Sequence, residues 1–320
     1  MMDAIMTDGL SFAMPLLIMA IGGIYSERAG VVMLAIEGLQ GFGAFVGAAA
    51  AVISGIYLGT ESPLLIFIAM AAAMAGGAAF SSIHALLCVK FRAQQVISGM
   101  VVNTLAMALS PFLTSVINRA ITGNESNKFQ IGPSVRFTVP GLSEIPLVGG
   151  LFKSMYPFEI VIIAAALISC YVLYKTRYGL RLRACGENPH SLDAAGGDVN
   201  RTRTIAVLIC GALSGLGGVF LAYSISATYS PNIYVGYGYL SIAAMIFGNW
   251  KIPPTACVCM FFGLARSAGY QLCLYLGMPG SYSDLLLTLP YALTLLLLVF
   301  FSKRNNPPRA MGETFDRSRR

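Results

Sequence analysis

Residues 64–89 read LLIFIAMAAAMAGGAAFSSIHALLCV, a stretch without a single Asp, Glu, Lys or Arg. The stretch is longer than the run of about 20 apolar residues that an α-helix needs to cross a bilayer. The whole 320-residue chain has the same character, since 56% of its residues are hydrophobic and only 11% are charged, against about 25% charged in soluble domains. The sequence therefore predicts a membrane-embedded protein whose surface meets lipid.

Further apolar blocks repeat this pattern along the chain. We expect all of them to be helices, because only helices and closed barrels satisfy the backbone in hydrocarbon, and barrel strands would alternate polar and apolar residues. The predicted fold is all-α and polytopic, with about eight to ten transmembrane helices and about nine favoured. The other blocks are Leu10–Tyr25, Gly30–Tyr57, Val96–Ile117, Phe158–Tyr174, Thr204–Ile225, Tyr239–Phe247, Thr255–Leu276 and Leu285–Phe301.

Most of the basic residues lie in three regions: the segment 175–203, the pair Lys90 and Arg92, and the tail 303–320. Lys and Arg mark cytoplasmic loops, so we assign these regions to the cytoplasm and the polar loop 118–157 to the extracytoplasmic side. The net charge of +7 thus belongs to loops, and no folded basic face for nucleic acid is predicted. We therefore predict a transmembrane domain over residues 1–302 and a basic cytoplasmic tail over residues 303–320.

Two blocks are expected to be irregular. Leu10–Tyr25 contains Pro15, and Tyr239–Phe247 is too short to cross a bilayer unaided. Interrupted or half-spanning segments are typical of transport pathways, although an ordinary loop dipping into the headgroups is an equal alternative. Small residues at Gly43–Gly47, Ala75–Ala79 and Gly211–Gly215 predict close helix packing and carry no information on a solute.

The sequence contains no catalytic set, no metal or cofactor motif, and no Gly-rich loop of the kind that binds ATP. Glu37 is the carboxylate predicted to lie deep in the first half, and a charge there costs at least about 2.5 kcal/mol unless it faces protein or water. It is either a gate residue or a structural hydrogen-bond centre. Gln40, Asn103, Ser241 and Asn249 leave the same two alternatives open. Arg266 and Asp284 are interpreted as a charge that extends to the interface and a helix cap.

The segment 175–203 contains a candidate docking element. Gly186–Ser191 supplies a turn with Glu187 and Asn188, and a short helix stopped by glycine is predicted over Leu192–Gly197, which includes Ala194, Ala195 and Gly196. A short helix between basic stretches suits docking into another protein, with a plain loop as the alternative.

Three motifs resemble the permease subunits of ABC importers for nucleosides and simple sugars, a family that includes ribose and branched-chain amino acid permeases. The first is Ser26-Glu27-Arg28-Ala29-Gly30-Val31-Val32 with Ile36-Glu37-Gly38-Leu39. The second combines Gly186–Pro189, Ala194–Gly196 and Ser214–Gly218, and the third runs from Gly238-Tyr239 to Gly248-Asn249-Trp250. Their order and spacing match the family over nearly the whole chain.

This resemblance implies a multi-pass permease in the cytoplasmic (inner) membrane, surrounded by lipid, with 1–302 as the permease domain. Its implied partners are a second homologous permease, cytoplasmic ATPase subunits that hydrolyse ATP, and an extracytoplasmic substrate-binding lipoprotein. The chain itself would not be an enzyme. The helix at 190–197 would sit in the ATPase groove, with Glu187, Asn188, Ala194, Ala195 and Gly196 as coupling residues. Glu37, Gln40, Phe42, Asn103, Ser241, Phe247, Asn249 and Trp250 would lie near the translocation pathway.

One departure from the family bears on the solute. The family usually has Asn where this chain has Met33, and the stretch 35–42 is apolar and ends with Phe42. A nucleoside is the favoured cargo, and riboflavin, whose flat ring suits an aromatic path, is the alternative. An ion-coupled secondary carrier is a further alternative, but it would be expected to show more intramembrane carboxylates than Glu37 alone. A membrane enzyme is disfavoured because no nucleophile, base or metal set converges.

Overall fold

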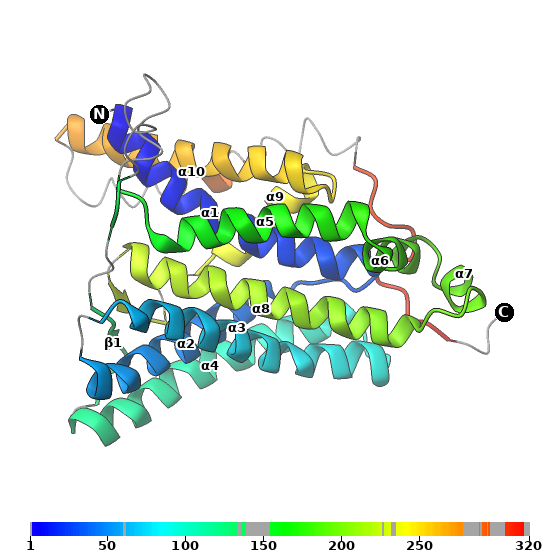
Figure 1. Cartoon of the computed structure of the whole chain (residues 1–320), viewed down its shortest axis with the longest axis horizontal. Helices are drawn as coiled ribbons and strands as arrows, with labels where there is room; N and C mark the ends of the chain where they lie inside the picture. Colours follow the sequence, from blue (N-terminus) through cyan, green and yellow to red (C-terminus); the bar gives the residue numbers. More distant parts are fainter. Residues whose placement is uncertain are drawn as a thin grey trace.

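The computed structural model of this chain is an elongated bundle of helices (Figure 1). The structure describes residues 2–59, 62–123, 125–132, 136–138, 154–225, 227–231, 235–277, 288, 290–292, 294 and 305–316. Within these residues, seven helices are long and apolar enough to cross a membrane, which confirms the prediction of an all-α polytopic fold. They are α1 (Met2–Arg28), α2 (Ile36–Leu58), α3 (Leu64–Ala85), α4 (Gln95–Thr122), α5 (Pro157–Lys175), α8 (Val199–Ile225) and α10 (Ile252–Tyr275).

Shorter elements complete the described structure. They are the π-helix η1 (Leu86–Lys90), α6 (Arg177–Glu187), α7 (Pro189–Ala194), α9 (Tyr237–Phe247), β1 (Phe129–Gln130) and β2 (Thr228–Tyr229). The two strands pair antiparallel, with Phe129 opposite Tyr229. The predicted block Leu285–Phe301 lies almost entirely outside the described residues.

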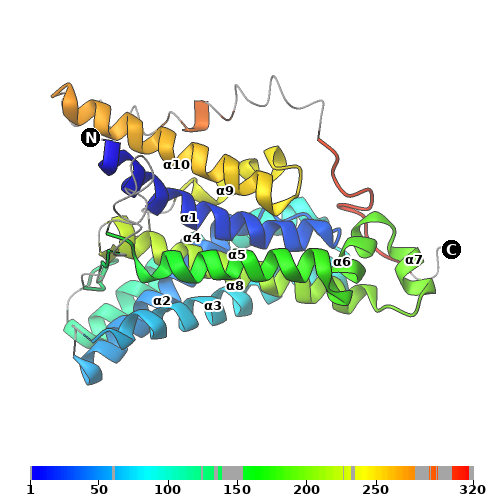
Figure 2. The ribbon, with the colours of Figure 1, turned by 45° about the horizontal axis from the view of Figure 1, so that its top comes forward.

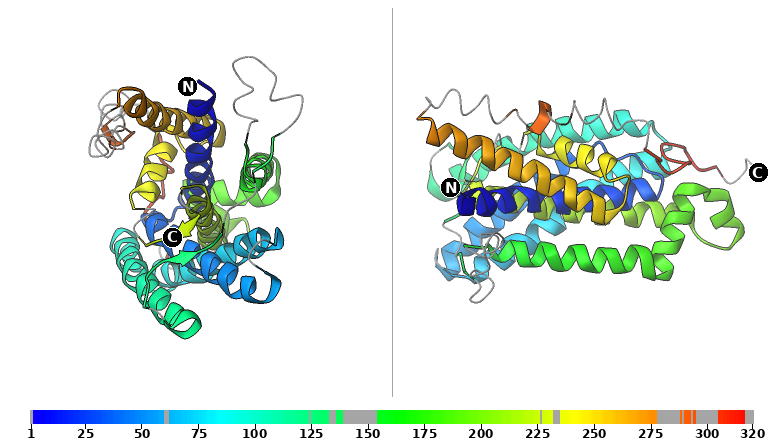
Figure 3. Two further views of the ribbon diagram at one scale, coloured as in Figure 1. Left: turned by 90° about the vertical axis from the view of Figure 1, so that its left-hand side faces the viewer. Right: turned by 90° about the horizontal axis from the view of Figure 1, so that it is seen from above.

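Helix α8 is the centre of the bundle and packs on α1, α2 and α3 (Figure 3). Small residues make this packing close. A Cβ added to Gly43 would lie 2.3 Å from the Cα atom of Gly215, and a Cβ on Gly77 would lie 2.2 Å from the carbonyl oxygen of Gly211. The small-residue stretches are therefore helix contacts, as predicted, because only side chains of this size let backbones touch.

The two ends of the bundle differ in character. Helices α6 and α7, the turn containing Arg92, and the segment 305–316 gather at one end, which we call the basic end (Figure 2). There Arg92 forms an ion pair with Asp316 at 3.2 Å. The N-terminus and the β1–β2 pair lie at the opposite end. The predicted orientation requires the three basic regions to share one end.

Helix α9 crosses only half of the bundle (Figure 3). It has 11 residues and is therefore about 16 Å long, whereas the hydrocarbon core is about 30 Å thick. Helix α9 starts inside the bundle and ends at the basic end, where α10 begins. The prediction of a half-spanning segment is confirmed.

The start of the chain differs from the prediction. Helix α1 continues through Pro15 without interruption, because neighbouring helices can satisfy a backbone group freed by proline. The irregularity lies instead between Arg28 and Ile36, where residues 31–33 have no helical structure. The predicted helix start at Gly30 was therefore wrong by about two turns.

Candidate functional site

The non-helical segment 31–34 runs through the bundle, and buried side chains satisfy its backbone. Gln95 accepts a hydrogen bond from the Val32 amide at 2.7 Å, and Glu27 accepts one from the Met33 amide at 3.3 Å. His84 contacts the Val32 carbonyl oxygen at 3.2 Å, and Asn103 donates to the Leu34 carbonyl oxygen at 2.8 Å. Unwound backbone at membrane depth persists only with such partners. These bonds explain why helix α2 starts late.

The N-terminus of α9 lies against the start of α2, and Glu37 joins them. Its carboxylate accepts hydrogen bonds from the amides of Gly236 at 2.5 Å and Gly238 at 2.7 Å. Gln40 donates a third bond at 3.1 Å. The first amides of a helix lack internal partners and carry partial positive charge, so a buried carboxylate there is well placed. These contacts favour the structural alternative for Glu37. We call Glu37 with residues 236–238 the α9 anchor.

Asn103 links α4 to the α9 anchor. Its side-chain oxygen accepts from the Gly38 amide at 2.7 Å, and its amide group also contacts the Tyr239 hydroxyl at 3.2 Å. Ser241 is fully buried and donates to the Gly238 carbonyl oxygen within α9. The structure thus brings Glu37, Gln40, Asn103 and Ser241 together around one helix start.

Phe42 belongs to a different cluster. Its ring stacks on Phe80 with centroids 4.2 Å apart, and it also contacts Phe45. Phe45 in turn contacts Phe129 and Tyr229 of the strand pair. Phe42 therefore fixes α2 against α3 and is not brought to the α9 anchor, because its place on α2 turns the ring toward α3.

The other end of α9 holds the remaining predicted pathway residues. Phe247 packs edge-on against Phe262. Asn249 and Trp250 adopt left-handed backbone conformations in the turn to α10, and buried Trp250 donates its indole N–H to Glu27 at 2.6 Å. This turn is separated from Glu37 by the length of α9, so the predicted pathway residues lie at both ends of this helix. Because α9 has 11 residues, its two ends lie about 16 Å apart.

The segment 175–203 forms two helices rather than one. Asn188 separates them and caps α7, accepting a hydrogen bond from the Ser191 amide at 3.1 Å. Helix α7 begins at Pro189 and ends at Ala194, so the predicted helix over 192–197 was placed too late; Ala195 and Gly196 lie beyond it. The side chains at Glu187, Asn188 and Ala194 and the residues Ala195 and Gly196 are all exposed.

A groove runs between α6 and α7. It is lined by apolar and small residues from both helices, among them Leu180, Ala184, Leu192 and Ala195. Behind it, burial raises the pKa of the Cys185 thiol, which therefore stays neutral and serves as a packing group. The groove offers a concave surface to a second protein.

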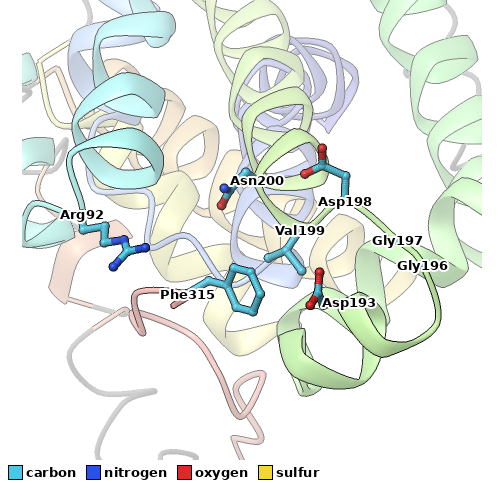
Figure 4. A pocket seen from close by; sticks show the side chains of 8 residues that line it. All are labelled: Arg92, Asp193, Gly196, Gly197, Asp198, Val199, Asn200 and Phe315. Carbon is cyan, nitrogen blue, oxygen red and sulfur yellow. The ribbon is translucent and has the colours of Figure 1, made fainter. Parts of the chain in front are cut away.

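A second cavity lies where α7, α8 and the chain's end meet (Figure 4). Its volume is about 260 Å³, and it is lined by Arg92, Asp193, Phe315 and residues 196–200. Three segments far apart in the sequence build it. We call the surface formed by the α6–α7 groove and this cavity the basic face. It is built from several parts of the chain, a property that no single motif reveals.

The segment 305–316 is bound to this end of the bundle. The Ala310 amide donates to the Gly186 carbonyl oxygen at 2.8 Å, and the Gly312 amide donates to Gly30 at 3.1 Å. The Asn306 amide donates to the side chain of Asn249 at 2.9 Å. This segment therefore connects the α6–α7 region, the end of α1 and the α9–α10 turn. Sequence reasoning treated it only as a basic tail.

Arg203 holds this segment in place, which gives a stability prediction. It is buried, and its guanidinium donates to the carbonyl oxygens of Ala29 at 3.2 Å and Glu313 at 2.8 Å. We expect Arg203→Gln to lower the free energy of unfolding by about 2 kcal/mol or more, since charged donors are lost from buried acceptors. Thermal unfolding of the detergent-solubilised protein measures this. Arg201→Gln, at an exposed neighbour, is the matched control, and an equal effect of both variants would contradict the assignment.

Buried charges are more numerous than predicted. Glu27 and Glu159 are buried as Glu37 is, whereas Glu37 alone was singled out from the sequence. Arg266 does not extend to an interface but stacks over Phe12 and Tyr237, and Asp284 lies outside the described residues. Glu159 could have been found from its place in the block Phe158–Tyr174.

The geometry defines a class of protein. The buried polar side chains named above bind backbone at an interrupted helix pair, and discontinuous helices of this kind build transport sites in membrane proteins. A composite face at one end is exposed for partners. These features describe a membrane permease.

Comparisons with known proteins give the family. The family described as branched-chain amino acid transport system / permease component matches residues 5–300. The chain belongs to this family and is the transport subunit of an ABC importer, a multi-pass protein of the cytoplasmic membrane. The ion-coupled carrier is thereby set aside.

Three relatives show how far the similarity extends. The guanosine ABC transporter permease protein NupQ of Bacillus subtilis is 37% identical, over 97% of this chain and 96% of its own. The nucleoside ABC transporter permease protein NupC of Lactococcus lactis is 35% identical, over 99% and 98%. A putative glucose ABC transporter permease protein, TsgC13 of Haloferax volcanii, is 30% identical, over 78% and 71%. No solved structure matches the chain significantly.

Proposed function

We propose that this permease imports nucleosides. The observation that carries the proposal is the 37% and 35% identity, over nearly the whole chain, to permeases named for guanosine and for nucleosides. The relative named for glucose is less similar and covers less of the chain. Nothing found supports riboflavin, and Met33, the residue that suggested it, is buried in the core.

The importer needs partners that this chain does not supply. We assign ATP hydrolysis to separate cytoplasmic subunits, since the chain has no ATP-binding loop, and solute capture to an extracytoplasmic binding lipoprotein. A second, homologous permease would pack beside this one. Large apolar side chains on α4 and α5 are available to such a neighbour, since Val101, Phe112, Leu167 and Tyr171 are more than half exposed.

The basic face is the proposed site of coupling to the ATPase. Ala195 lines the α6–α7 groove and Gly196 lines the neighbouring cavity. Glu187, Asn188 and Ala194 are exposed close to them in the chain. In this proposal the ATPase binds the groove and moves α6 and α7 when it closes on ATP. The hydrogen bond between Gly186 and Ala310 continues through the segment 305–316 to Asn306 and Asn249. Movement at the basic face would thus reach the end of α9.

The pathway role belongs, in this proposal, to α9 and its surroundings. Helix α9 is held at its start by Glu37, and the Trp250–Glu27 bond in the turn after its end would have to break when the helix moves. Asn103, Gln40 and Ser241 support the start, whereas Phe247, Asn249 and Trp250 form the moving end. Half-helices next to unwound backbone are the elements that rearrange in transporters. Access would alternate when α9 pivots on its anchor.

Uptake in cells tests the cargo. The chain is expressed with its partner genes in cells that lack other nucleoside uptake, and accumulation of radiolabelled guanosine is measured. We expect ATP-dependent uptake that excess uridine or adenosine inhibits and that excess glucose or riboflavin does not. If the importer accumulates no labelled guanosine, uridine or adenosine but does accumulate labelled glucose or riboflavin, the nucleoside proposal is refuted.

A further inference from the structure

A cavity of about 350 Å³ opens at the end of the bundle opposite the basic face. Four helices surround it. The residues that line it include Ser11 and Phe12 of α1, Tyr156 just before α5, Ser224 near the end of α8, and Arg266 of α10. The volume is within the range of small-molecule sites, about 300–1,000 Å³. None of these residues takes part in the α9 anchor or the basic face.

Arg266 is the unusual group in this cavity. Its guanidinium carbon lies 4.0 Å from the centre of the Phe12 ring and 4.8 Å from that of Tyr237. Its Nε atom is buried and has no hydrogen-bond partner among the residues that the structure describes. A cation inside a membrane helix costs several kcal/mol and marks a functional site by default. The ring faces of Phe12 and Tyr237 offset part of that cost. The Nε–H group of Arg266 remains available to donate a hydrogen bond.

The rest of the cavity combines flat faces with polar groups. Arg136 stacks over the Tyr156 ring at 4.6 Å and hydrogen-bonds its hydroxyl. Ser11 donates to Glu159 at 3.0 Å, while the second carboxylate oxygen of Glu159 is buried and has no partner within the described part of the chain. A hydrogen-bond donor of Arg266 and an acceptor oxygen of Glu159, both without a partner among the described residues, thus line or adjoin a space bounded by aromatic rings.

We propose that this cavity is an extracytoplasmic binding site for the nucleoside within the permease itself. A nucleobase is flat, stacks on aromatic rings and guanidinium groups, and carries carbonyl and ring-nitrogen acceptors for Arg266. Its ribose hydroxyls suit Ser11 and the Glu159 carboxylate that Ser11 contacts. This inference rests on the nucleoside import proposed above and adds where the solute first binds.

The position of the cavity links binding to the moving helix. Arg266 stacks on Tyr237, the first residue of α9, and Tyr237 lies between Gly236 and Gly238, whose amides bind Glu37. A solute that draws the guanidinium into the cavity weakens its stacking on Tyr237. Solute bound in the cavity would therefore change the contacts of the α9 anchor. Arg266 would contact both the solute and the start of α9.

A protection experiment tests the site directly. Ser224→Cys is introduced into the assembled importer, and labelling at residue 224 by a membrane-impermeant maleimide is followed by mass spectrometry. We expect guanosine to slow labelling at least about threefold and glucose to leave the rate unchanged. Adding Arg266→Gln should remove the protection, whereas Arg119→Gln should keep it. Arg119 is an exposed arginine that pairs with exposed Glu125 outside the cavity.

Transport by the same variants separates the two proposals. Arg266→Gln should raise the KM for guanosine about tenfold or more, as loss of a charged hydrogen-bond donor predicts. If Ser224→Cys imports guanosine but guanosine never alters its labelling, the cavity site is refuted and nucleoside import stands. If the wild-type importer transports no guanosine or other nucleoside, the proposed function fails and this site fails with it.

Discussion

Glu37→Ala is expected to reduce solute uptake to less than about a tenth of the wild-type rate. The variant leaves the part-buried amide of Gly236 and the buried amide of Gly238 without their acceptor, and an unsatisfied buried donor costs about 1–3 kcal/mol. The start of helix α9 is then no longer held in place, so movement that reaches the end of α9 from the basic face cannot turn the helix about its start. Uptake of radiolabelled guanosine, normalised to the amount of permease in the membrane, measures the effect.

The control variants distinguish an anchor from a solute ligand. Glu37→Gln keeps one acceptor oxygen and should retain an intermediate rate, while Glu125→Ala, at an exposed carboxylate, should transport normally. As an anchor, Glu37 also stabilises the fold, so Glu37→Ala should lower the thermal midpoint by several degrees. A raised KM with unchanged stability would instead identify Glu37 as a solute contact.

Ala195→Trp is expected to abolish the stimulation of ATP hydrolysis by loaded binding protein and to reduce uptake by more than about tenfold. Ala195 lines the α6–α7 groove, and an indole there fills the surface that the ATPase would occupy. Because Ala195 is exposed, the permease itself should fold and reach the membrane. Glu187→Lys should act in the same direction, since it reverses a charge at the end of α6. ATPase activity and uptake of the reconstituted importer are measured together.

A bulky substitution outside the groove is the comparison for Ala195→Trp. Arg309 is exposed on the same end of the bundle and does not line the groove, so Arg309→Trp should leave coupling intact. If Ala195→Trp retains full stimulation and assembles normally, the groove is not the docking site. The proposed coupling residues would then have to be sought around the Arg92–Phe315 cavity.

Much of the fold follows from properties of short stretches. A block such as Leu64–Val89 has no charge to place in water, so its helix could be predicted without any partner. The length of the block Tyr239–Phe247 likewise predicted a half-spanning helix, because its nine residues cannot reach across the hydrocarbon. Close packing at Gly43 and Gly215 could be expected from residue size alone.

The candidate site was predicted only in part. Glu37, Asn103 and Ser241 stand out as polar residues in apolar blocks, and the structure groups them. Phe42 and Trp250, which the resemblance placed near the same pathway, lie apart from this group, because the Phe42 ring packs on Phe80 and Trp250 follows the far end of α9. Glu159 and Arg266 were underrated, because sequence does not show which way a side chain in a membrane helix faces.

The sequence by itself determined that this chain spans the membrane, that α9 falls short of crossing it, and which family it belongs to, because hydrophobic length and motif order are properties of the chain. Tertiary structure alone decided that residues 31–34 unwind, that Glu37 holds α9, and that 305–316 ties the basic face to the α9–α10 turn. Each of these depends on hydrogen bonds between residues distant in sequence, as Glu37 and Gly238 are. Such bonds exist only once the helices have packed.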